Sequence, residues 1–131
     1  MQRNKFKYLL LPLAIVASLN AADMRSLLFH GNCITCHFEH KSVSAPSIDK
    51  IKENYMRAFP SREDFISYMA NWIVKPSKDT SIMLDAIKKY ELMPELGFEE
   101  STTREIASYI YDTNFSKKHE GHDYSSTINS Q

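Results

Sequence analysis

The sequence has little glycine or proline, few cysteines and no excess of charge of one sign. Its 131 residues include 3 Gly, 5 Pro and 2 Cys, with 16 basic and 16 acidic side chains. So little Gly and Pro excludes a collagen-like or low-complexity chain. The hydrophobic share of 43% is enough for a core, and the length is that of one domain.

The sequence also lacks, near its N-terminus, an apolar run long enough to span a membrane. The run there extends from Tyr8 to Leu19, whereas a membrane-spanning helix needs about 20 residues. It follows a basic start and precedes two small residues, Ala21 and Ala22, which is the order found in a secretory signal peptide. We expect residues 1–22 to be a cleaved signal peptide, with an uncleaved N-terminal anchor as the alternative.

Cleavage would change the charge balance of the chain. Residues 1–22 hold three basic and no acidic side chains, so 13 basic and 16 acidic ones remain, a formal charge of −3. Nucleic-acid binding normally needs a basic patch, and we therefore expect no nucleic-acid partner. We also expect a periplasmic location, no stable membrane insertion after cleavage, and a monomer.

The rest of the chain shows apolar residues at helical spacing and no alternating pattern typical of strands. We predict an all-α domain over residues 23–115 with about four to five helices, and a polar, disordered tail over residues 116–131. Ser61 with Asp64 and Thr102 with Glu105 resemble capping boxes that begin two helices. The predicted helices cover residues 24–33, 48–58, 61–75, 80–90 and 102–112.

The strongest chemical signal is the run Cys33-Ile34-Thr35-Cys36-His37, which has the spacing of c-type haem attachment. Two thiols at this spacing can reach two vinyl groups on one edge of a porphyrin, while His37 reaches the iron from one face. The other imidazole nitrogen needs an acceptor that fixes the ring, and we expect a backbone carbonyl near Pro46 to supply it. The run thus predicts one covalent haem c on Cys33 and Cys36, with His37 as an axial ligand.

Two other interpretations of the cysteines are weaker. A thioredoxin-like disulfide would need strands in an α/β pattern, and a zinc site would need four converging ligands. His40 lies three residues after His37 and would sit on the same side of the iron. His119 and His122 lie in the polar tail, where a solvated segment is the better interpretation.

A second axial ligand has to come from elsewhere in the chain, and a thioether sulfur in that place raises the reduction potential. Met69 and Met83 lie on helical apolar stripes, and we interpret them as core residues. Met93 differs because it lies in a helix-breaking loop, directly before Pro94. We therefore predict Met93 as the ligand. The methionines after residue 22 are Met24, Met56, Met69, Met83 and Met93.

With these motifs, the sequence resembles the class I monohaem cytochromes c over about residues 24–115. The resemblance implies a helical bundle wrapped around the haem, in which the first and last helices cross and Phe29 meets Tyr109. It also suggests that Pro46, Tyr55 and Trp72 belong to the haem pocket, although Tyr55 and Trp72 are equally compatible with plain core positions. The motifs that carry it are the Cys33–His37 run, Ala45-Pro46, Leu92-Met93-Pro94 and the final helix with Tyr109-Ile110.

One departure from the family concerns the segment after the haem motif. Phe38 stands where many members have Gly, and residues 39–44 contain no Gly. We infer that the local turn differs from that of the family, and we expect Phe38 to shield the haem edge.

The function that the resemblance implies is electron transfer without enzymatic turnover. One electron at a time would be exchanged with an oxidase, reductase or dehydrogenase through the exposed haem edge. The alternatives are a haem-containing subunit of a larger redox complex, a haem-based sensor, and a peroxidase-like enzyme with an open iron site.

Overall fold

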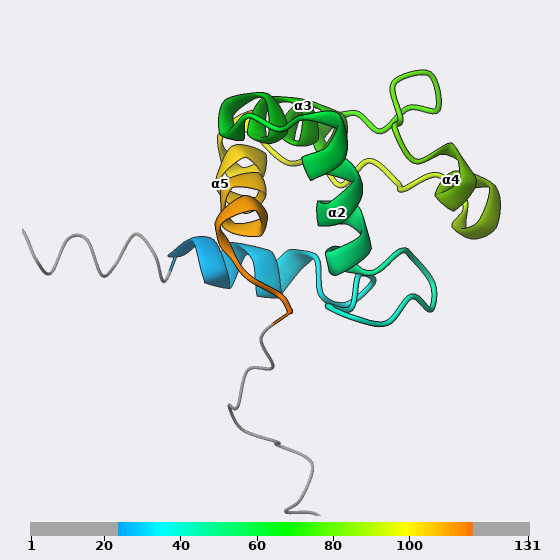
Figure 1. Ribbon diagram of the computed structural model, residues 1–131, viewed down its shortest axis with the longest axis horizontal. Coiled ribbons are helices and arrows are strands. Elements are labelled where there is room, and N and C mark those ends of the chain that lie inside the picture. The colour runs from blue at the N-terminus through cyan, green and yellow to red at the C-terminus, as the bar shows by residue number, and fades with distance from the viewer. Residues whose placement is uncertain (1–23, 117–131) are drawn as a thin grey trace, which may run out of the picture.

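The computed structural model describes residues 24–116, and these form five helices and no strand (Figure 1). The all-α prediction is therefore confirmed for this part of the chain. No helix within it is both long and apolar enough to cross a membrane. The predicted signal peptide and residues 117–131 of the predicted tail lie outside the described residues. The helices cover residues 24–32, α2 Ile48–Ala58, α3 Arg62–Val74, α4 Leu84–Tyr90 and α5 Glu100–Asp112.

The boundaries of α2 and α3 follow from local sequence signals. The helix α2 has the predicted bounds and ends shortly before Pro60, which cannot continue a helix interior. Ser61 is the N-cap of α3, and its side chain accepts a hydrogen bond of 3.1 Å from the backbone N–H of Asp64. This cap confirms the predicted start of the helix.

The predicted starts of α4 and α5 are wrong. Residues 80–83 are not helical: the chain turns at residues 79–80 and bends at Ile82, and the hydroxyl of Ser81 accepts a hydrogen bond of 3.1 Å from the N–H of Met83. The helix α5 begins at Glu100, with Glu99 as an N-cap that makes no side-chain hydrogen bond. Thr102 therefore lies inside α5, and the capping box predicted for it with Glu105 does not begin the helix.

The core is formed mainly between α3 and α5, which pack closely along their lengths. Phe65 and Ile106, the centres of their two apolar faces, have no exposed surface. The helix α2 packs against both of them, and the helix over residues 24–32 crosses α5 near its C-terminal end (Figure 1).

The predicted contact between the first and last helices is present. The ring centroids of Phe29 and Tyr109 lie 5.0 Å apart, and those of Phe29 and Phe115 lie 5.7 Å apart. Phe29 is fully buried, so its ring is the main apolar anchor of the N-terminal helix. Lys52 of α2 secures the same end of α5 by donating hydrogen bonds of 2.6 Å to the carbonyl oxygens of Tyr111 and Thr113.

Substitution of this anchor tests the arrangement of the helices. We expect Phe29→Ala to lower the free energy of unfolding by about 3–5 kcal/mol, the range for deletion of a buried aromatic ring. Leu27→Ala, on the same helix but at a side chain that is 67% exposed, should change it by no more than about 0.5 kcal/mol. Urea-induced unfolding measures both, and equal effects of the two substitutions would contradict the described packing.

Candidate functional site

A cavity of about 270 Å³ lies between the helices, and all five contribute to its wall. Most of the lining side chains are aliphatic, aromatic or thioether groups, which suits an apolar occupant. The chemically distinctive lining residues are Cys33, Cys36, His37, Met69, Met83 and Met93.

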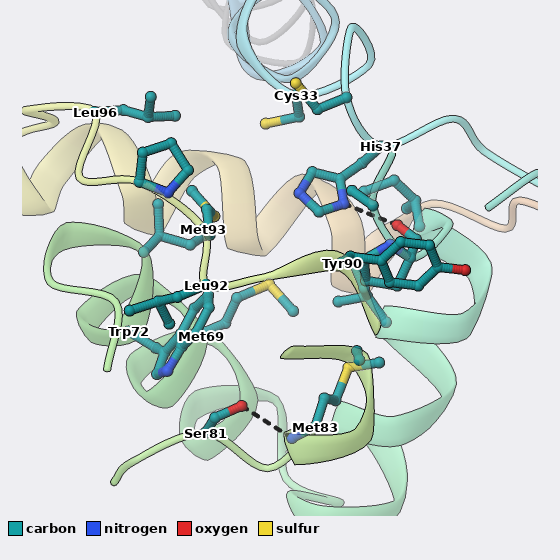
Figure 2. Close-up of a pocket in the computed structure, with 18 of the residues that line it drawn as sticks. Cys33, His37, Met69, Trp72, Ser81, Met83, Tyr90, Leu92, Met93 and Leu96 are labelled. Atoms are coloured by element: carbon teal, nitrogen blue, oxygen red, sulfur yellow. Dashed lines mark hydrogen bonds between the residues drawn. The ribbon is translucent and has the colours of Figure 1, made fainter. Parts of the chain in front are cut away.

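The two cysteines and His37 reach the cavity because the chain turns at the end of the N-terminal helix. The N–H of Cys33 still bonds to the carbonyl of Phe29 at 2.9 Å, as in a helix. The N–H groups of Cys36 and His37 then both bond to the carbonyl of Cys33, at 3.2 and 2.9 Å. This tight turn keeps Cys36 and His37 close to Cys33, and all three line the cavity. Figure 2 shows Cys33 and His37 at one end of it.

The two thiols differ in their surroundings, although both are free. Cys33 is half-buried, and this burial, with a smaller contribution from the Cys36 thiol, raises the pKa of Cys33 to about 11. Cys36 is exposed, so one thiol lies inside the cavity mouth and the other at its rim.

A hydrogen bond fixes the ring of His37. Its Nδ1 lies 2.8 Å from the carbonyl oxygen of Pro46, which is the acceptor that the sequence predicted. Because a carbonyl only accepts, Nδ1 must carry the proton, and Nε2 keeps a free lone pair. Figure 2 shows the imidazole projecting into the cavity, so this lone pair is available to a ligand there.

The segment that brings Pro46 to His37 closes without glycine. The N–H of Ile48 donates to the carbonyl of Phe38 at 2.9 Å, and the N–H of Asp49 donates to that of Glu39 at 3.0 Å. These two bonds join the ends of the loop where the first turn of α2 begins. The side chain of Phe38 is 43% exposed and is not part of the cavity wall, so shielding of the haem edge by Phe38 would occur outside the cavity and stays a prediction.

Three methionines line the cavity. Met93 projects from the loop after α4 on the side opposite His37 (Figure 2). Met69 is 2% exposed and belongs to the core, as predicted, but it also lines the cavity, and so does the half-buried Met83. Met24 and Met56 are exposed and lie outside the wall.

The position of Met69 at the cavity was missed from the sequence, although a signal for it exists. Met69, Trp72 and Ile73 have the i, i+3, i+4 spacing that places residues on one helical face, and all three line the cavity. Because Trp72 was already assigned to the pocket, this spacing could have assigned Met69 as well. Met83 has the same spacing with Ala86 and Ile87, and all three line the cavity, but the sequence assigned none of them to the pocket.

The three residues predicted for the pocket, Pro46, Tyr55 and Trp72, all line the cavity. Tyr55 is also a core residue, and its burial, with a smaller contribution from Tyr68, raises the pKa of its phenol. The indole N–H of Trp72 donates a hydrogen bond of 3.0 Å to the carbonyl of Ser77. This bond satisfies the polar edge of Trp72, so that its ring can form an apolar wall (Figure 2).

The other described histidines, His30 and His40, are not part of the cavity wall. His40 is exposed, and its Nδ1 lies 3.4 Å from a carboxylate oxygen of Asp49. His119 and His122 fall outside the described residues. Over residues 24–116, no group of three or more His, Cys, Asp or Glu side chains could hold a metal ion.

The donor set at the cavity fits a c-type haem. Two thiols lie at one end, an imidazole with a free nitrogen lone pair points inward, and a thioether lies across from it, within apolar walls. Imidazole and thioether are the axial ligands of c-type cytochromes. The chain matches no family model, no curated protein and no solved structure, so its function has to be inferred from this chemistry.

The tautomer of His37 is directly testable. In the haem-free protein at alkaline pH, we expect ¹⁵N NMR to find Nδ1 protonated and Nε2 unprotonated, because only Nδ1–H can donate to Pro46. In urea, where this bond is lost, His37 should lose that preference. A folded protein with the proton on Nε2 of His37 would contradict the hydrogen bond.

Proposed function

We propose that this protein carries single electrons on one haem c, attached covalently through Cys33 and Cys36 and ligated by His37 and Met93. The observation that carries the proposal is the cavity itself, whose wall combines these four residues with otherwise mostly apolar side chains. When bound, the haem supplies an iron that changes between the ferric and ferrous states by one electron.

The residues of the chain would hold and tune this group in distinct ways. Cys33 and Cys36 would form thioether bonds at one edge of the haem. The bond from His37 Nδ1 to Pro46 orients the imidazole ring and would leave Nε2 to bind the iron. The thioether of Met93 would favour the reduced state and raise the reduction potential.

The apolar wall has its own effect on the reduction potential. Burial in surroundings of low dielectric constant disfavours the state with the greater charge, which here is the ferric one. Tyr55, Ile106 and Ile110 are buried where they meet the cavity, so this part of the wall excludes water.

The cavity chemistry favours a carrier over a peroxidase-like enzyme. A peroxidase needs an open iron site with acid–base groups on the side opposite the proximal histidine. Among the described lining residues, His37 is the only histidine and Glu91 the only carboxylate. The thioether of Met93 would occupy the sixth position that peroxide needs.

Contact with redox partners would occur at the cavity mouth. Cys36 is exposed there, and Leu96, which also lines the cavity, is 48% exposed. An electron can pass across this edge without entry of a substrate. We therefore propose transient contacts with an oxidase, reductase or dehydrogenase.

Two methionine substitutions test the proposal. We expect Met93→Ala to abolish the long-wavelength absorption band of Met-ligated ferric haem. It should also lower the reduction potential by on the order of 0.1 V, a fraction of the ~0.8 V range that axial ligands control. Met83→Ala removes a thioether from the same cavity and should leave the band in place and the potential nearly unchanged.

Absorption spectroscopy and potentiometric titration measure both quantities. Loss of the band in Met83→Ala, or its retention in Met93→Ala, would refute the assignment of Met93. Absence of bound haem in protein made with haem-attachment machinery would refute the proposed function as a whole.

A further inference from the structure

The segment that carries Met93 is attached to the rest of the protein differently from the other helical parts. We define residues 76–98 as the flap; it contains α4. The helix α4 has no buried residue and packs against none of α2, α3 and α5, and Figure 1 shows it standing apart from them. The inward side of the flap lines the cavity instead, with side chains that include Met83, Ile87 and Leu92.

Side chains of α3 hold the flap near its beginning. The indole of Trp72 donates to the carbonyl of Ser77 at 3.0 Å, and the hydroxyl of Tyr68 donates to the carbonyl of Thr80 at 2.7 Å. Beyond Thr80, the flap meets the cavity mainly through apolar groups. Its position therefore depends on what it encloses and on its own backbone.

The backbone of the flap has two unusual residues, one on each side of the stretch that contains Met93. Among residues 24–116, only Glu91 and Gly97 have a positive φ, and both have a φ of 70°. Glu91 has a ψ of 173°, which places it in a region that is essentially restricted to glycine. Gly97 adopts its φ without penalty because it has no Cβ.

We infer that Glu91 and Gly97 are the two hinges of residues 92–96, the part of the flap that carries Met93, and that Glu91 is a positioning residue whose strained backbone opposes closure of Met93 over the cavity. The N–H of Glu91 bonds to the carbonyl of Ile87 at 2.9 Å, so the chain changes direction at Glu91 as it leaves α4. Opening of residues 92–96 would release the strain. The bond from Met93 to iron would therefore be weaker than the same bond in an unstrained loop. This inference rests on the role proposed for Met93.

Substitutions at the two hinges should have opposite effects. Glu91→Gly removes the strain, whereas Glu91→Ala removes the carboxylate but keeps a Cβ at the same φ. Gly97→Ala adds strain at the second hinge. Because a Cβ built there meets no atom within 4 Å, the free-energy cost of this substitution comes from the positive φ and not from a steric clash. Gly31→Ala is the matched control, because its Cβ also meets nothing and its φ is not positive.

The readout is displacement of Met93 by added imidazole in the haem-loaded protein, followed through loss of the Met–ferric band. We expect the Glu91→Gly variant to need at least about three times as much imidazole as the Glu91→Ala variant before half of Met93 is displaced. This ratio reflects the free energy of the strain that glycine relieves in the closed state. It is reduced by the greater conformational freedom that glycine gives the open state. Gly97→Ala should need about threefold less imidazole than the unsubstituted protein, and Gly31→Ala should need the same amount.

Equal half-displacement for Glu91→Gly and Glu91→Ala would overturn the inference. So would a shift of global urea unfolding in these variants without any shift in displacement, because that result would mean an ordinary structural role.

A separate measurement keeps the hinge testable if the proposed function fails. If the protein carries no haem or shows no Met–ferric band, hydrogen exchange of the amide of residue 91, whose N–H bonds to the carbonyl of Ile87, replaces displacement in the same variants, and each rate is expressed relative to that of the unfolded chain. Slower exchange in Glu91→Gly than in Glu91→Ala would support the strained hinge. Equal exchange would refute it, independently of the cofactor.

Discussion

Much of the apolar surface of this small chain faces a cavity, and this constraint governs how the helices are arranged. Apolar side chains gain free energy only when they leave water. Around Phe29, Phe65 and Ile106 they do so by packing against one another. On the other side of α2, α3 and α5, and on the inner side of α4, the cavity is lined by apolar groups. An apolar occupant would complete the burial that these helices begin.

The division of the apolar side chains between the packed core and the cavity wall explains which parts of the protein are well anchored. The crossing of the N-terminal helix with α5 has a fully buried aromatic contact at Phe29, and it holds the end of the Cys33–His37 turn in place. The flap has no comparable contact, because α4 packs on no other labelled helix. Of the two proposed axial ligands, His37 would therefore come from the better anchored side of the cavity, and Met93 from the side that depends most on the occupant.

Local sequence signals predicted the elements whose determinants are local. Apolar spacing and Pro60 define α2, and the Ser61 cap defines the start of α3. The predicted start of α4 is too early because Ile82 and Met83 share helical spacing with Ala86 and Ile87, whereas the chain bends at Ile82 and the helix begins only after its N-cap, Met83. Thr102 resembled a cap, yet helix geometry begins earlier, after Glu99.

The candidate site was predictable to a different extent on its two sides. The proposed attachment residues Cys33 and Cys36 lie three positions apart in the sequence, and the acceptor for His37 could be expected near Pro46 from the need to fix its ring. Met93 faces His37 across the cavity, although the two residues are far apart in the chain. In the sequence, only the position of Met93 in a loop indicated this arrangement. The backbone of Glu91 could not be predicted, because a residue type other than glycine gives no indication of a positive φ.

Intact mass spectrometry under denaturing conditions tests the central claim most directly. Protein produced with haem-attachment machinery should have the mass of its polypeptide plus one haem, and acidified organic solvent should not remove the added mass. Replacement of Cys33 and Cys36 by Ser should abolish the addition. The mass of the polypeptide alone, or a haem that the solvent extracts, would contradict covalent attachment at this cavity.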